Sequence, residues 1–137
     1  HLGGPEALNT HGFTQIAIER TACYGPCPVY VAVVTAGGKV SYWGDKHVPQ
    51  NGRRTGTVYD IGFARLARLA HELEIDKLND SYSVAVTDNQ TVYVSLIRNG
   101  KKKTIRHYAP AMSGPRRLFA FENEVDRVIE RAQWDQQ

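Results

Sequence analysis

The sequence predicts an α+β fold in which two helices pack on one face of an antiparallel sheet. Segments with the two-residue period of strands and segments with the 3.6-residue period of helices follow one another in the order β-β-β-(β)-α-β-β-β-α. Short glycine-containing turns separate neighbouring strands, which favours hairpins over the long crossovers of a parallel sheet. Most of the strands alternate apolar and polar residues, which is typical of a sheet with one face in water.

The expected strands combine period-two alternation with β-branched residues. They cover residues 14–20, 29–35, 40–43, 55–59, 84–86, 91–98 and 103–108. The run Val29 to Val34 is rich in β-branched residues and predicts a central strand that is covered on both faces. Residues 44–54 are polar and predict a surface loop. Asn99-Gly100 predicts a type I′ turn, because both residues tolerate a positive φ.

The two expected helices each carry one apolar stripe. Asp60 is expected to cap the first helix, and Pro115 is expected in the first turn of the second, which runs to about Gln133. The stripes consist of Phe63, Leu66, Ala67, Ala70 and Leu73, and of Leu118, Phe121, Val125, Val128, Ile129 and Ala132. Burial is also expected for Trp43 and Trp134, with exposure as the alternative for Trp134.

Length and composition indicate a single globular domain. The chain has 137 residues, of which 42% are hydrophobic and 23% charged, so intrinsic disorder is excluded for most of it. We expect a flexible leader over residues 1–13, one α+β domain over 14–134 and a tail over 135–137. No apolar run reaches the roughly 18 residues of a membrane-spanning segment.

Cys23 and Cys27 form the most distinctive motif, with Tyr-Gly-Pro between them. A disulfide closing so short a loop would stabilise the fold by about 2 kcal/mol, and we expect a structural disulfide in an exported protein. Two alternatives stay open. A catalytic dithiol is disfavoured because thioredoxin-like sites have two intervening residues and a helix N-terminus. Reduced cysteines or a metal-binding pair are disfavoured because structural zinc sites generally have four ligands.

Further motifs accompany the cysteines. The segment Ile16-x-Ile18-x-Arg20-Thr21-x-Cys23-Tyr24-Gly25-Pro26-Cys27-Pro28-x-Tyr30 is followed by Gly38-x-Val40-x-Tyr42-x-Gly44, Asp80-x-Tyr82 and Thr87-Asp88. Together they resemble a family of small bacterial domains of unknown function, often found in exported proteins or lipoproteins, over about residues 14–131. The resemblance implies an extracytoplasmic setting, whether periplasmic, lipid-anchored or secreted, and brings no catalytic residues. The chain carries no export signal, and removal of such a signal would leave a start of this kind.

The sequence assigns no catalytic residue, metal site or cofactor. The five histidines lack the i, i+4 pair of zinc hydrolases, and we expect imidazoles that are solvated or hydrogen-bonded. They are His1, His11, His47, His71 and His107. Ser113-Gly114 lacks the nucleophile elbow Gly-x-Ser-x-Gly. Asp45 with His47, and Asp80 with Asp88, are the remaining pairs that a distant residue could join in space.

The expected function is an extracytoplasmic protein-binding module, such as a small inhibitor or immunity-type protein, whose partner has an acidic surface. Cations beside aromatic residues are typical of protein interfaces. The expected binding surface comprises Arg53, Arg54, Lys101, Lys102, Lys103, Trp43 and His47. Two alternatives are an enzyme, either a thiol oxidoreductase using Cys23 and Cys27 or an unrecognised hydrolase, and a nucleic-acid binder. The last is disfavoured by a net charge of only +3. The lysine run is also typical of a solvated sheet edge.

Overall fold

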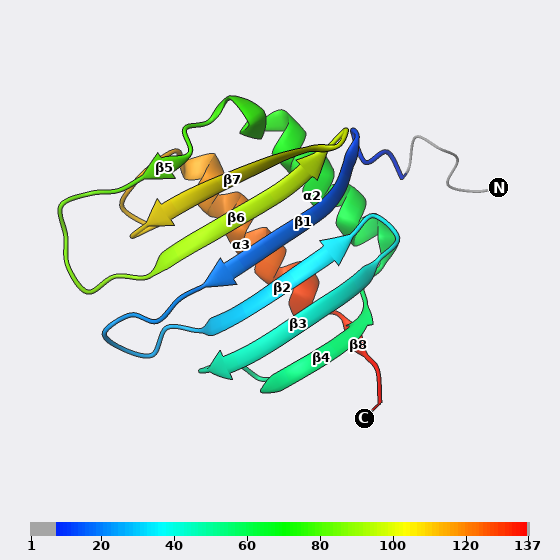
Figure 1. The fold of residues 1–137 in the computed structure, drawn as a ribbon, viewed down its shortest axis with the longest axis horizontal. Coiled ribbons are helices and arrows are strands. Elements are labelled where there is room, and N and C mark those ends of the chain that lie inside the picture. The colour runs from blue at the N-terminus through cyan, green and yellow to red at the C-terminus, as the bar shows by residue number, and fades with distance from the viewer. Residues whose placement is uncertain (1–7, 137) are drawn as a thin grey trace.

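An eight-stranded sheet with two α-helices against one face forms the fold in the computed structural model, which describes residues 8–136 (Figure 1). The strands are β1 (Phe13–Arg20), β2 (Val29–Thr35), β3 (Lys39–Lys46), β4 (Gly52–Thr57), β5 (Ser81–Tyr82), β6 (Thr91–Arg98), β7 (Lys101–Tyr108) and β8 (Gln133–Trp134). The helices are α2 (Asp60–Glu72), the 3₁₀ turn η1 (Ile75–Lys77) and α3 (Arg116–Glu130). The predicted α+β class is therefore confirmed. The first seven residues of the expected leader, and residue 137, lie outside the described residues.

The strand order is β5-β7-β6-β1-β2-β3-β4-β8, and every pairing except β5 with β7 is antiparallel. β1 to β4 form a meander, and the β6–β7 hairpin adds to the other side of β1, which makes β1 a central strand. The hairpin turns at Asn99 and Gly100, whose φ angles are +50° and +80°. Both signs are those of the predicted type I′ turn.

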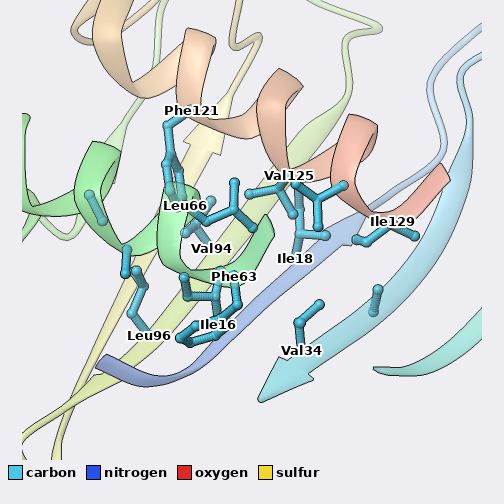
Figure 2. Packing of buried hydrophobic residues seen from close by; sticks show 14 of the residues in the cluster. Ile16, Ile18, Val34, Phe63, Leu66, Val94, Leu96, Phe121, Val125 and Ile129 are labelled. Carbon is cyan, nitrogen blue, oxygen red and sulfur yellow. The ribbon is translucent and has the colours of Figure 1, made fainter. Parts of the chain in front are cut away.

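The core lies between the sheet and the two helices. Figure 2 shows aliphatic side chains of β1, β2 and β6 meeting aromatic and aliphatic side chains of α2 and α3. Members of this cluster include Ile16, Ile18, Val34, Val94, Leu96, Phe63, Leu66, Phe121, Val125 and Ile129. The predicted helical stripes are buried, except that Ala132 lies beyond the end of α3 and is half-buried. Fully burying one large apolar side chain contributes about 1.5–3 kcal/mol.

Two predictions about strands and loops are wrong. The expected loop over residues 44–54 contains the end of β3 and the start of β4, which pair through Gly44 and Gly52. Residues 44–54 show no alternation of apolar and polar side chains. The strand geometry of β4 comes from its backbone pairing with β3. The expected strand over 84–86 is not formed, and the preceding residues Ser81 and Tyr82 pair with β7.

The helix ends also differ from the prediction. Asp60 is the first residue of α2 and not its cap, since Tyr59 occupies the N-cap position without a side-chain cap hydrogen bond. Pro115 occupies the N-cap position of α3. α3 ends at Glu130, because the following residues turn to pair with β4, where Trp134 lies opposite Gly56. Trp134 is half-buried there.

Candidate functional site

The face of the sheet opposite the helices is open, and strand register builds one continuous row of side chains across it. In Figure 1 this face lies in front of the helices. We call the row, which crosses β4, β3, β2, β1, β6 and β7, the open-face row. Its members are Arg53, Trp43, Val31, Glu19, Tyr93 and Arg106. Directly opposed residues have Cβ atoms about 4.5–5.5 Å apart, so neighbours in the row are close enough to interact.

β2 departs from the usual pattern of an open sheet face. Such a face normally carries polar residues, but the outward positions of this strand hold Val29, Val31 and Val33, all half-buried. The prediction that residues 29–34 are covered on both faces is wrong, because both helices pack on the other face. Trp43, expected to be buried, is 43% exposed beside these valines. The open face therefore has an apolar centre that residues 8–136 do not cover.

The charged residues around this centre are mostly basic. Open-face positions in regular register carry four basic side chains and one acidic side chain: Lys39, Arg53, Lys102, Arg106 and Glu19. Asp45 and Lys46 flank a register shift between β2 and β3, and their charges cancel. An apolar centre with a charged rim is the usual anatomy of a protein interface.

The residues predicted for the binding surface occupy different parts of the sheet. Trp43 and Arg53 are direct neighbours in the open-face row. Arg54 points to the covered face, opposite Tyr42. His47 lies after β3 and lines a pocket on the helix side. The structure thus brings two of these four predicted residues together.

The lysine run lies near the other edge of the sheet. Three strands separate β7 from β3, so Lys101 to Lys103 are about 19 Å from Trp43 across the sheet. Lys102 faces the open side, whereas the Nζ atom of Lys103 lies 2.9 Å from Asp80 Oδ1 and also donates to the carbonyl of Leu78. The three lysines therefore have different surroundings.

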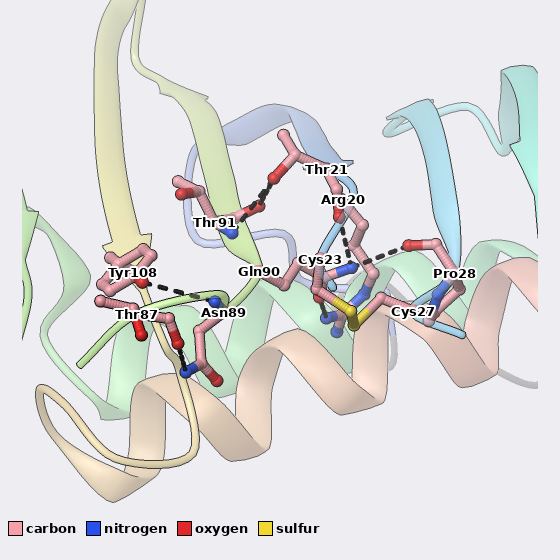
Figure 3. The surroundings of a disulfide bond; sticks show 10 residues. All are labelled: Arg20, Thr21, Cys23, Cys27, Pro28, Thr87, Asn89, Gln90, Thr91 and Tyr108. Atoms are coloured by element: carbon pink, nitrogen blue, oxygen red, sulfur yellow. Dashed lines mark hydrogen bonds between the residues drawn. A yellow bond between two sulfur atoms is a disulfide. The ribbon is translucent and has the colours of Figure 1, made fainter. Parts of the chain in front are cut away.

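The cysteine loop joins β1 to β2 and contains the predicted disulfide between Cys23 and Cys27, whose Cα atoms are 5.7 Å apart (Figure 3). Gln90 fastens both ends of the loop, because its Nε2 donates to the carbonyls of Thr21 and Pro28 at 2.8 Å each. The loop connects two strands, so the cysteines do not stand at a helix N-terminus, the feature that activates thioredoxin-like thiols.

Beneath this loop, Arg20 and Asp126 form a largely buried ion pair. Arg20 Nε donates to Asp126 Oδ1 at 2.9 Å, and its Nη2 lies 2.7 Å from Oδ2. Arg20 Nη1 donates to Gln90 Oε1, and the Tyr30 hydroxyl donates to Asp126. Burial lowers the pKa of Arg20, but Asp126 raises it more, so the guanidinium stays charged. The network links the cysteine loop to α3.

His107 and Glu122 form a second buried pair, and both side chains are fully buried. His107 Nδ1 lies 2.6 Å from Glu122 Oε2, and its Nε2 lies 2.7 Å from the carbonyl oxygen of Ser113. A carbonyl oxygen only accepts hydrogen bonds, so Nε2 of His107 carries a proton. One further proton lies between Nδ1 of His107 and Oε2 of Glu122. Burial lowers the pKa of His107, but its two partners raise it above the usual value; burial raises the pKa of Glu122. With both ring nitrogens engaged and no exposure, this histidine has a structural role.

The sequence patterns assign no role to Arg20, His107, Glu122 and Asp126. A signal is present, however. Arg20 and His107 stand where the alternation of their strands requires an apolar residue, and Glu122 and Asp126 lie one turn apart beside the stripe of α3. Polar residues on an apolar period predict buried pairs, because a buried charge requires a partner.

Residues 8–136 contain neither a cluster of metal ligands nor a helix that could span a membrane. Within this part of the chain, no three His, Cys, Asp or Glu side chains gather as a metal site requires. None of its helices has both the length and the hydropathy needed to cross a membrane.

Comparison with known proteins gives a family but no activity. No curated protein matches the chain. The family described as a domain of unknown function (DUF6438) matches residues 14–129, which agrees closely with the extent of the expected resemblance. The predicted membership in a family of unknown function is confirmed, while bacterial export stays a prediction. The chain belongs to the DUF6438 family.

Proposed function

We propose that this protein is an extracytoplasmic binding module whose open sheet face docks on an acidic surface of a partner protein, as a small inhibitor or immunity-type protein would. The observation that carries the proposal is the uncovered apolar centre on β2 and β3. Val31 lies opposite Trp43 and Val33 lies opposite Ala17, on a face that none of the described helices covers. Exposed apolar patches rimmed by polar residues mark interaction sites.

The charges support an acidic partner. Arg53 and Arg106 end the open-face row on its two sides, and Lys39 and Lys102 lie on the same face. Complementary charge accelerates association and excludes partners of the wrong sign, whereas the apolar centre provides most of the affinity. Glu19 lies between Val31 and Tyr93 in the row and provides a site for one basic group of the partner.

The test compares variants during capture from a lysate of the native source. The oxidised protein is immobilised as wild type, as Trp43→Ala, as Val31→Glu and as Ile61→Ala. Ile61 is 64% exposed on α2 and serves as the matched apolar control away from the open face. We expect one acidic protein to be retained by wild type and Ile61→Ala and lost by the other two. Removal of a central tryptophan costs about 2 kcal/mol of binding, or roughly thirtyfold in affinity.

Circular dichroism and thermal unfolding show whether each variant is folded. A protein retained equally by Val31→Glu and wild type contradicts the open-face assignment, as does the absence of any protein that discriminates between the variants. Arg106→Glu adds a second readout, because it should slow association and weaken its dependence on salt.

The extracytoplasmic part of the proposal is supported by the disulfide, since such bonds persist in oxidising compartments. Trapping of free thiols in intact cells tests it. We expect Cys23 and Cys27 to be protected from alkylation until a reductant is added. Free thiols at both positions in the living cell would place the protein in a reducing compartment.

A further inference from the structure

A pocket of about 410 Å³ opens on the helix-covered side of the molecule, away from the open-face row. Three aromatic rings that neighbour one another in space line the pocket. The Tyr30 and Tyr42 ring centroids are 5.6 Å apart, and those of Tyr42 and Trp134 are 5.0 Å apart. Pro28, Ile129 and the loop segment 48–49 complete its apolar lining. The volume falls within the range of small-molecule sites.

The charged groups of the pocket are acidic. Asp126 and Glu130, one helical turn apart on α3, both line it, and no Lys or Arg of the described chain does so. Asp126 is balanced by the buried Arg20, and its side chain is 24% exposed. Glu130 is exposed and forms no ion pair with any described residue. The pocket therefore combines aromatic rings with one uncompensated carboxylate at its edge.

A hydrogen bond and a close backbone approach shape the pocket. Tyr42 donates its hydroxyl hydrogen to the carbonyl of Gln50 at 2.8 Å, which holds the loop between β3 and β4 against the aromatic rings. Gly44 permits this closure, because a Cβ atom at that position would lie 2.1 Å from the same carbonyl oxygen. Burial and the neighbouring Asp126 raise the pKa of Tyr30, so its hydroxyl stays protonated as a donor to that carboxylate.

We propose that this pocket binds an organic ammonium ion, with Glu130 and the half-buried ring of Trp134 meeting the positive charge and Ile129 contacting the apolar body. Aromatic rings attract ammonium groups through their negative faces, and an adjacent carboxylate adds to the attraction. The ion is either a free quaternary amine or the side chain of a lysine in a peptide. This inference concerns the other face of the molecule and does not depend on the proposed protein interface.

The two tryptophans provide an internally controlled test. Trp134 lines the pocket, whereas Trp43 lies on the open face. Choline and its uncharged carbon isostere, dimethylbutanol, are titrated into isotope-labelled protein, and the two indole N–H resonances are followed by NMR. We expect choline to shift the Trp134 resonance and not that of Trp43, and to bind about tenfold more tightly than the isostere. A peptide with one lysine is titrated in the second arm of the experiment. The cation that binds more tightly identifies the source of the ammonium group.

Two variants complete the design. Glu130→Gln should weaken cation binding about threefold to tenfold, because it removes the charge but keeps the shape. Glu72→Gln is the matched control, since Glu72 is an exposed glutamate on α2 outside the pocket. Failure of both cations to bind more tightly than dimethylbutanol, equal effects of the two variants, or no shift of Trp134 with either cation at millimolar concentration would each overturn the proposal.

Discussion

The two faces of the sheet break the alternation of apolar and polar residues in opposite ways. The covered face contains polar side chains at one end, where Arg20 and His107 lie in the same cross-strand row. Each of them has a carboxylate partner on α3. The open face contains apolar side chains such as Val31 and Trp43, for which the described chain provides no cover. The comparison shows that the two polar exceptions inside have charged partners within the chain, whereas the apolar exceptions outside have no such neighbour among the described residues.

The largest expected effect comes from the apolar part of the covered face. Phe63→Ala removes a fully buried ring of α2 and should lower the free energy of unfolding by about 3–5 kcal/mol. Urea denaturation measures it, and Val31→Ala on the open face is the paired substitution. Losses of similar size from both would contradict the difference between the faces.

The polar end of the covered face should be nearly as sensitive. His107→Ala leaves Glu122 buried without its partner, and we expect a loss of about 3 kcal/mol in the free energy of unfolding. Glu122→Gln keeps a hydrogen-bonding group in place, so about 1 kcal/mol is expected. If the two variants unfold at the same denaturant concentration, the unpaired charge is not the cause of the loss.

The disulfide should contribute an intermediate amount. Replacing Cys23 and Cys27 by serine releases a loop that spans five residues, and the expected loss is about 2 kcal/mol. Gln90 still holds both ends of the loop, so the fold should persist. Thermal unfolding with and without reductant measures the effect, and a protein that unfolds completely on reduction would assign the loop a larger role.

The same buried pair predicts a dependence on pH. The pKa of His107 is raised above 6.5, so the folded state binds more protons than the unfolded state once the pH exceeds that value. Stability from this group is full at lower pH and is lost as the pH rises through the folded pKa. The raised pKa of Glu122 acts in the same direction above 4.5, and the Arg20 charge opposes both. Denaturation from about pH 6 to about pH 9 should show the decline, with a flatter curve for Glu122→Gln.

The smallest expected effect on folding belongs to the open face. Trp43→Ala should change the free energy of unfolding by no more than about 1 kcal/mol, since the ring is 43% exposed and neighbours only other open-face side chains. The same substitution should remove partner capture. A large loss of stability would mean that this face is part of the core, and the proposed interface would then lose its basis.

Local patterns predicted those parts of the fold where local and tertiary forces agree. β2 and β6 begin and end at the predicted residues, and the Asn99-Gly100 turn has the predicted signs of φ. Prediction failed at β4, whose polar residues become a strand only by pairing with β3, and at the helix ends, where tertiary contacts decide the last turn. No periodic pattern in the sequence predicts the strand β4 or the positions of the helix ends.

For the candidate site, the sequence by itself identified the cysteine pair, Trp43, Arg53 and Lys102, and the apolar character of β2 on both faces, but it did not identify Lys39 or Arg106. Only the tertiary structure decided which of them meet. It placed Trp43 beside Arg53, separated both from the lysine run by the width of the sheet, and left the outer valines uncovered. The physical reason is that residue type and spacing determine which side chains avoid water, whereas the order of the strands and the side chosen by the helices determine which surface stays open.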